Sequence, residues 1–214
     1  MKKLFVVTVL FALPIVAYLF FASGVHSFAK LPTLTTDIQE LNGFTTADGE
    51  PVSFQDHISI LGFFGEQPQE FGGHAYNLGG KIYDNYYKFT DFQLLIAVPE
   101  GTREQVKQLE QELANITNPL KWKFIYGSPE EIRSLFSSLQ TDLQLQDDLS
   151  TPYVFIIDKK GDLRGRDDDE DAGTLYGYDT RSVATLDDKM NDDVKVILAE
   201  YRLALKKYNT DKEQ

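Results

Sequence analysis

Four short apolar runs, each bounded by turn residues, constrain the fold of this chain most strongly. They are rich in β-branched and aromatic residues, as is typical of strands buried on both faces of a sheet. The runs are ISILGFFG at 58–65, FQLLIAVP at 92–99, WKFIYG at 122–127 and YVFIID at 153–158. Because helical patterns separate them, the sequence predicts an α/β domain.

Two of the intervening segments carry helix-start signals and an apolar stripe. Thr102 and Gln105 have the spacing of a capping box. Ser128 is the expected N-cap of the second helix, and Glu131 completes its box. The residues expected to face inward are Val106, Leu109, Leu113 and Ile116 in the first helix, and Ile132, Leu135, Phe136 and Leu139 in the second. Both segments are predicted to be crossover helices.

The domain is predicted to close on a hairpin and a final helix. A turn signal at 159–162 leads from the last apolar run into LRG, and a shorter hairpin signal lies at Asp48 and Gly49. The final helix is expected to bury Met190, Val194, Ile197, Leu198, Tyr201 and Leu205. This order predicts a three-layer α/β sandwich with a mixed central sheet, which is the thioredoxin-like plan.

An uncharged apolar segment at residues 4–23 follows Lys2 and Lys3. About 20 such residues can cross ~30 Å of hydrocarbon, so we expect one N-terminal transmembrane helix that contacts the membrane through this segment. A retained anchor is favoured because the run is longer than the apolar region of an ordinary signal peptide, while small residues at 25–27 offer a cleavage site as the alternative. The lysines predict a cytoplasmic N-terminus and a C-terminal domain on the outer, periplasmic side.

Length and composition limit the organisation and the partners of the chain. We expect an anchor or uncleaved signal at 1–24, a tether at 25–43, a single thioredoxin-like domain at 44–208 and a polar tail at 209–214. The net charge of −12 opposes binding to nucleic acid. The chain has no cysteine, which excludes disulfides, thiolate nucleophiles and thiolate metal sites.

Three segments carry a resemblance to a known family. They are ADGEPVSFQDHISILGFFG, GSPEEI and PYVFIIDKKGDLRG, and together with the single N-terminal apolar segment they resemble the Sco/SenC group of membrane-anchored thioredoxin-fold proteins. The similarity spans residues 44–166 and is weakest after Arg166. The resemblance implies a role in assembling respiratory cytochrome oxidase, through copper delivery and thiol–disulfide work. In that family copper is held by two cysteines of a C-x-x-x-C motif and one histidine.

This chain departs from the family at all three copper-binding positions. The two cysteine positions fall on Gln69 and Gly73, and the histidine position falls on Ser150. None of these side chains suits a soft cuprous ion. The resemblance therefore implies the fold and the location, while the residues speak against the family chemistry, and we expect no cofactor.

Pro152 opens the last apolar run at a position that resembles the cis-proline strand of thioredoxin-like proteins. We predict a cis Thr151–Pro152 bond, with a trans proline that merely begins a strand as the alternative. The surface beside this proline would include Gln67 and Pro68, from the loop that follows the first apolar run. By resemblance, this is the surface on which a partner peptide would lie.

The acidic segment at 167–171 is a candidate cation site. Its carboxylates, together with one further along the chain, are Asp167, Asp169, Asp171 and Asp179. Read as an EF-hand, the segment places Ala172 where glycine is required, so that pattern fails. A looser Ca²⁺ or Mg²⁺ site stays open, beside the alternative of a solvated acidic loop neutralised by Arg164 and Arg166.

His74 and Glu70 lie one helical turn apart at the exit of the loop after the first apolar run. Two ligands are too few for a metal site, so a solvated or hydrogen-bonding histidine is favoured over a ligand. The aromatic segment KIYDNYYKF follows. We expect its residues Ile82, Tyr86 and Phe89 to be buried, and Tyr83 and Tyr87 to be partly exposed.

The sequence contains no G-x-S-x-G elbow, no P-loop and no H-E-x-x-H pattern. The favoured interpretation is a membrane-anchored, non-catalytic, thioredoxin-like protein that contacts a protein partner in envelope or respiratory-complex assembly. One alternative is a protein that binds a divalent cation through Asp167–Asp171. Another is an enzyme with an unrecognised site near Pro152.

Overall fold

The computed structural model describes residues 12–15, 30–114 and 122–212, and side chains as far as residue 204. The predicted membrane segment at 4–23 lies mostly outside these residues. Within the described ranges, no helix has the length and apolar character needed to span a bilayer. The expectation for Ile116 also falls outside them.

A mixed seven-stranded sheet forms the centre of the domain, with strand order β1-β6-β5-β2-β3-β4 and β9 paired to β5. Its strands are β1 (Thr33–Thr35), β2 (Ile58–Phe64), β3 (Phe92–Pro99), β4 (Trp122–Gly127), β5 (Ser150–Ile157), β6 (Leu163–Arg164) and β9 (Tyr178–Asp179). Strands β2, β3 and β4 are parallel, whereas β5 is antiparallel to β2 and β6. All four predicted apolar runs are strands, and the predicted mixed sheet is confirmed.

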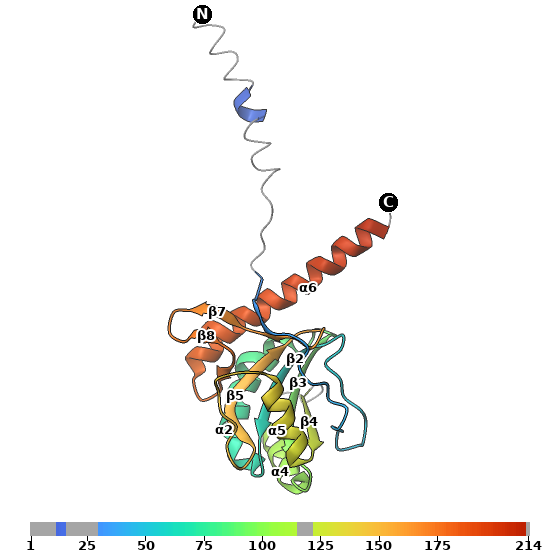
Figure 1. Ribbon diagram of the computed structural model, residues 1–214, viewed down its shortest axis with the longest axis vertical. Coiled ribbons are helices and arrows are strands. Elements are labelled where there is room, and N and C mark those ends of the chain that lie inside the picture. Colours follow the sequence, from blue (N-terminus) through green and yellow to red (C-terminus); the bar gives the residue numbers. More distant parts are fainter. Residues whose placement is uncertain (1–11, 16–29, 115–121, 213–214) are drawn as a thin grey trace, which may run out of the picture.

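Helices cover both faces of this sheet (Figure 1). They comprise the 3₁₀ turn η1 (Pro68–Phe71), α2 (Gly72–Leu78), the π-helical turn η2 (Gly79–Tyr83), α3 (Asp84–Tyr86), α4 (Arg103–Leu113), α5 (Pro129–Ser138), the π-helical turn η4 (Thr185–Met190) and α6 (Asn191–Lys212). α5 packs on one face, and α2, α4 and the first turns of α6 pack on the other. In Figure 1 the rest of α6 projects beyond the body of the domain.

The two predicted crossover helices form, but only one of them has the predicted cap. Ser128 Oγ accepts a bond from the Glu131 amide, and the Glu131 carboxylate accepts one from the Ser128 amide, so this capping box is confirmed. The other box is wrong, because the Thr102 hydroxyl donates instead to the Pro99 carbonyl at 2.8 Å. Every predicted inward-facing residue of these helices within the described ranges is buried.

The segment predicted as a tether is partly built into the domain. β1 pairs with β6, and the side chains of Leu31, Ile38 and Leu41 are buried. The domain therefore begins well before residue 44. At the other end, residues 209–212 of the predicted polar tail are helical, because α6 continues through Lys212.

The aromatic segment packs differently from the prediction. Tyr83 is fully buried and Phe89 is 45% exposed, whereas Ile82 and Tyr86 are buried as expected. The helical segment ends with α3 at Tyr86, so Phe89 lies in the turn beyond it rather than on a buried helix face. Tyr83, the last residue of η2, packs against Trp122, at 5.9 Å between ring centroids.

Candidate functional site

The loop after β2 turns sharply at Gly65, which has a φ of +65°. A Cβ atom at this position would lie 2.4 Å from the Asp148 carbonyl oxygen, so the turn requires glycine. The next amide, that of Glu66, donates to the same carbonyl at 2.9 Å. The start of the loop is thus held against the segment that enters β5.

The three positions predicted by resemblance to correspond to the copper ligands, Gln69, Gly73 and Ser150, lie on η1, α2 and β5. The buried side-chain oxygen of Gln69 has no hydrogen-bond partner among the described residues, and Gly73 is exposed. Ser150 is 1% exposed, and its hydroxyl donates to Asp148 Oδ1 at 2.7 Å. Their side chains supply an amide, a hydrogen and a hydroxyl, and none is a thiolate or an imidazole.

The prediction of a cis proline is wrong, because the Thr151–Pro152 bond is trans. β5 begins two residues before Pro152, and Thr151 pairs with Phe63 of β2. An extended strand that runs through this position accommodates a trans bond. Beside it, Pro68 is buried and Gln67 is exposed, so only part of the predicted surface is accessible.

A hydrogen-bonded chain connects α2 to β5 through a residue that the sequence did not single out. Thr180, directly after β9, donates from its hydroxyl to the Pro152 carbonyl at 2.7 Å and from its amide to the same oxygen at 3.0 Å. The hydroxyl oxygen is 2.7 Å from His74 Nδ1. Because the threonine proton is directed to Pro152, Nδ1 of His74 is assigned as the donor to Thr180, which leaves Nε2 as the acceptor of the neutral ring. Asn77 adds a bond to the Thr180 carbonyl at 3.0 Å.

His74 is partly buried beside the ring of Phe71, at 4.7 Å between ring centroids. Burial lowers the pKa of His74 below 6.5, the positive charge of Arg181 lowers it further, and Asp179 partly opposes both effects. Asp179 is itself paired with Arg181 at 2.7 Å. The imidazole is therefore held neutral as a hydrogen-bonding residue, in agreement with the favoured interpretation of the sequence.

Replacing His74 with glutamine should reduce the loss of stability of the protein in weak acid. The unfolded chain takes up a proton on this histidine near pH 6.5, while the folded protein takes it up only at lower pH. The contribution is therefore complete above pH 6.5 and is lost as the pH falls from there towards the pKa of the folded state. Urea unfolding of the full chain on both sides of pH 6.5 measures the difference.

The matched control for this experiment is His57→Gln. His57 lies in a turn, where its Nδ1 is 2.8 Å from the Gln55 carbonyl oxygen. Because His57 lies outside the hydrogen-bonded chain from α2 to β5, this variant shows what the loss of a histidine does to stability when that chain is left intact. Identical profiles for His74→Gln and the wild type would show that the hydrogen-bonded chain from α2 to β5 does not depend on the protonation state of His74.

The acidic segment forms a hairpin of β7 (Arg166–Asp169) and β8 (Gly173–Leu175), and two of its carboxylates, those of Asp169 and Asp171, form ion pairs within this chain. Lys189 Nζ lies 2.7 and 2.9 Å from the two oxygens of Asp169, and 2.7 Å from Asp171 Oδ2. The hydrogen bond from Lys189 is the largest effect that lowers the pKa of Asp169. Asp167 is exposed.

The prediction that Arg164 and Arg166 neutralise the acidic segment is wrong, because the main cation there is Lys189. Lys189 takes that role, while Arg164 pairs with Asp158 and Glu200, and Arg166 pairs mainly with Asp193. Nowhere in the described part of the chain do three or more His, Asp or Glu side chains gather so as to hold a metal ion.

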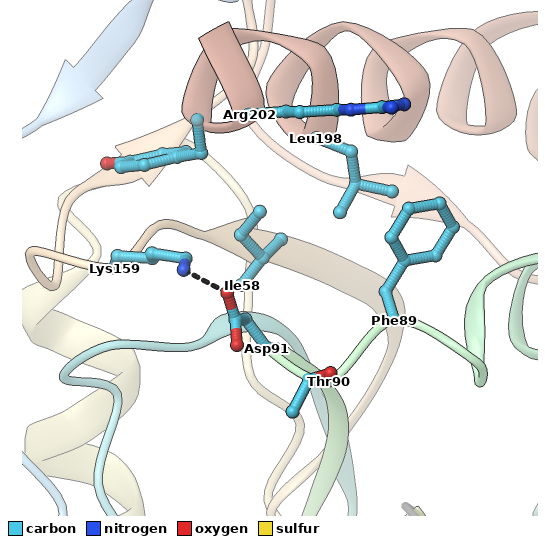
Figure 2. Close-up of a pocket in the computed structure, with 8 residues that line it drawn as sticks. Ile58, Phe89, Thr90, Asp91, Lys159, Leu198 and Arg202 are labelled. Carbon is cyan, nitrogen blue, oxygen red and sulfur yellow. Dashed lines mark hydrogen bonds and ion pairs between the residues drawn. The ribbon is translucent and has the colours of Figure 1, made fainter. Parts of the chain in front are cut away.

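A pocket of about 280 Å³ lies between α6 and the start of β2 (Figure 2). Leu198 points from α6 towards Ile58, and these two apolar side chains face each other across the pocket. The ion pair of Lys159 with Asp91 lies on one side, and Arg202 extends along the other. Gln69 follows the other end of β2, and Pro152 lies beside that end on β5. This pocket is therefore separate from the site expected from the sequence.

Comparison with known proteins relates the whole domain to one fold. No family model and no curated protein matches the sequence. A SCO1/SenC family lipoprotein from Bacillus anthracis aligns with a TM-score of 0.54 at 16% identity, over 82% of this chain and 99% of that one. BsSco, a member of the Sco family of cytochrome c oxidase assembly proteins, aligns with a TM-score of 0.50 at 15% identity, over 78% and 94%.

A putative protein disulfide isomerase from Bacteroides thetaiotaomicron is equally similar, with a TM-score of 0.53 at 12% identity, over 80% of this chain and 95% of that one. Sequence identities of 12–16% establish a shared fold and do not establish a shared function. The chain therefore has the thioredoxin-like fold, and it resembles the Sco/SenC proteins in structure while containing no cysteine.

Proposed function

We propose that this chain is a membrane-anchored, non-catalytic, Sco/SenC-like protein of the cell envelope that acts by binding a protein partner. The observation that carries the proposal is the set of side chains at the former ligand positions, Gln69, Gly73 and Ser150, in a chain without cysteine. Function on a shared fold depends on the site, and this site has lost the groups for thiol and copper chemistry. The remaining way for the domain to act is through contacts between its surface and another protein.

The location follows from the apolar segment at 4–23 behind two lysines. We propose that this segment is retained as a single-pass anchor, with the N-terminus in the cytoplasm and the domain on the periplasmic side. The description of BsSco as a member of a family of cytochrome c oxidase assembly proteins supports assembly of a respiratory or other envelope complex as the process.

The proposed contact surface is the exposed part of the loop after β2, together with α2. Gln67, Glu70 and Gly73 are exposed there, and Tyr76 is 55% exposed although it is a large aromatic residue. Tyrosine is enriched in protein interfaces because it buries a large apolar area and keeps a polar end. No pattern in the sequence marked Tyr76 as an exposed aromatic residue.

A photo-crosslinking residue placed at Gly73 or Tyr76 of the full chain, in native membranes, should give a discrete adduct with one protein. The control is the same residue at Asp168, which is exposed on the β7–β8 hairpin. Adducts that form equally from all three positions would indicate random collisions. Either that result or a complete absence of adducts from Gly73 and Tyr76 would reject this surface.

The two alternatives have no specific support in the structure. Lys189 already binds both Asp169 and Asp171, which are the centre of the candidate cation site. Near Pro152, the imidazole of His74 and the hydroxyl of Thr180 are both engaged in the hydrogen-bonded chain to the Pro152 carbonyl. A cation-binding or catalytic role is therefore not proposed.

A further inference from the structure

β4 is an edge strand, because the sheet order ends with β3 and β4. Among the described residues, its other side is paired at a single point. Tyr126 exchanges two backbone hydrogen bonds with Thr45, at 2.8 and 3.2 Å, in an antiparallel bridge. An edge of this kind presents backbone donors and acceptors that can pair with another chain.

The direction of these backbone groups follows from the alternation along a strand. Residues two apart direct their N–H and C=O groups to the same side. Since Tyr126 faces the edge, Phe124 and Trp122 face it as well. Within the described ranges, the Phe124 amide and carbonyl have no partner on that side.

The chain itself begins to cover this edge and then leaves it. Continued from the Thr45–Tyr126 bridge, antiparallel pairing would bring Ala47 opposite Phe124. Instead, Arg103 donates to the Ala47 carbonyl at 2.9 Å, and the segment from Thr46 folds into a turn closed by the bond from the Thr46 amide to the Glu50 carbonyl. The place where the next pair would form stays open.

A groove of about 200 Å³ occupies this place. It is lined by Thr46, Ala47, Asp48, Glu50, Glu110, Trp122, Lys123 and Phe124. The charged side chains among these residues are Asp48, Glu50, Glu110 and Lys123, so carboxylates outnumber cations in the groove. Asp48 and Glu50 are exposed and have no ion-pair partner in the described structure.

We propose that the open edge of β4 binds an extended segment of a partner protein, which adds to the sheet as an antiparallel strand and places a lysine or arginine near Asp48 and Glu50. Backbone pairing at Phe124 supplies the general affinity, and the carboxylates select a basic segment. This inference rests on the proposed function in that the partner is a protein, and it adds a second surface, distinct from α2.

The test uses the full chain in detergent micelles and a short fluorescent peptide of alternating valine and lysine. We expect saturable binding in fluorescence anisotropy, together with slower hydrogen exchange of the Phe124 amide. The same peptide with its valine amides N-methylated lacks the backbone donors and should bind much more weakly. Binding that is unaffected by N-methylation, or that leaves exchange at Phe124 unchanged, would overturn the proposal.

Charge selection is tested with Asp48→Asn and Glu50→Gln, each of which should weaken binding about two- to fivefold, as expected for one exposed ion pair. Glu170→Gln is the matched control, because it removes the same charge from an exposed position on the β7–β8 hairpin. Equal loss in all three variants would mean that overall charge alone attracts the peptide. If the peptide does not bind but a crosslinked adduct forms from Gly73 or Tyr76, the β4 site is rejected and the proposed function stands. If the peptide binds but no adduct forms from either position, the α2 surface is rejected and the β4 site stands.

Discussion

Replacing Arg164 with methionine should lower the free energy of unfolding by about 3–5 kcal/mol, the loss typical when one member of a buried ion pair is removed. Arg164 is 5% exposed. Its guanidinium lies 2.8 Å from both Asp158 and Glu200, and it also donates to the Leu31 carbonyl. Tyr201 donates a further bond to the same Asp158 carboxylate at 2.9 Å. Without the arginine, a carboxylate that is 2% exposed would stay buried and uncompensated.

The loss of stability in the Arg164 variant should not be uniform across the domain. Arg164 joins the entry of the domain at Leu31 to α6 at Glu200, so both ends of the described domain lose an attachment at once. Hydrogen exchange should therefore accelerate in β1 and in α6 before it does so in β2 and β3. A lysine at this position cannot replace the bonds to three separate acceptors, because its ammonium lacks the planar fork of arginine.

Arg181→Met is the matched control for this prediction, measured by urea unfolding of the full chain. Arg181 forms an ion pair of similar length with Asp179, but its side chain is 59% exposed. Exposed pairs contribute little, so this variant should lose at most about 1 kcal/mol. Asp158→Asn combined with Arg164→Met should lose less than the sum of the two single variants. Equal stability of the Arg164 and Arg181 variants would contradict the view that the buried network holds the two ends.

The central sheet was predictable because its strands carry an uninterrupted local signal. β2 and β3 are buried on both faces, which forces continuous apolar runs with turn residues at their ends. The Ser128–Glu131 capping box was predictable for the same reason, because its two residues are only three positions apart in the sequence. The predictions for Tyr83 and Phe89 failed for a different reason. The periodic pattern shows neither that the helix ends at Tyr86 nor that Tyr83 packs against Trp122, which is distant in the sequence.

The candidate site was predictable only in part. The position of the loop after β2 followed from the strand order, and the loss of thiol chemistry followed from composition alone. The bond between His74 and Thr180 joins residues 106 positions apart, and no short-range pattern marks such a contact. The same holds for Lys189, which lies 20 residues from Asp169 and turns a tempting cation site into an ion-paired hairpin.

Replacing Asp193 with alanine should destabilise the protein towards the lower end of about 3–5 kcal/mol. Asp193 is 5% exposed and accepts bonds from Arg166 at 2.8 and 3.0 Å and from the Tyr178 hydroxyl at 2.7 Å. Its loss leaves a buried phenol and a guanidinium without their shared acceptor. The effect lies at the lower end because the Arg166 side chain is 28% exposed, so water can partly solvate it.

The same network should make stability fall in alkali. Burial, and after it the charge of Asp193, raise the pKa of Tyr178 well above 10. Above pH 10 the unfolded chain releases the phenol proton while the folded protein keeps it, so the free energy of unfolding decreases as the pH rises. Tyr178→Phe removes this contribution, and its stability should fall less steeply above pH 10 than that of the wild type. At neutral pH it should lose about 1–3 kcal/mol, for one buried hydrogen bond and an acceptor left with fewer partners.

These variants bear on the site because Tyr178 and Thr180 are two residues apart at β9. Asp193 on α6 holds Tyr178, β9 pairs with β5, and Thr180 then joins Pro152 to His74. Weakening the first contact should therefore loosen the last, and in Asp193→Ala the pH profile near 6.5 should approach that of His74→Gln. If Asp193→Ala loses stability but keeps the wild-type pH profile near pH 6.5, the anchoring of β9 by α6 and the bond between His74 and Thr180 are energetically independent.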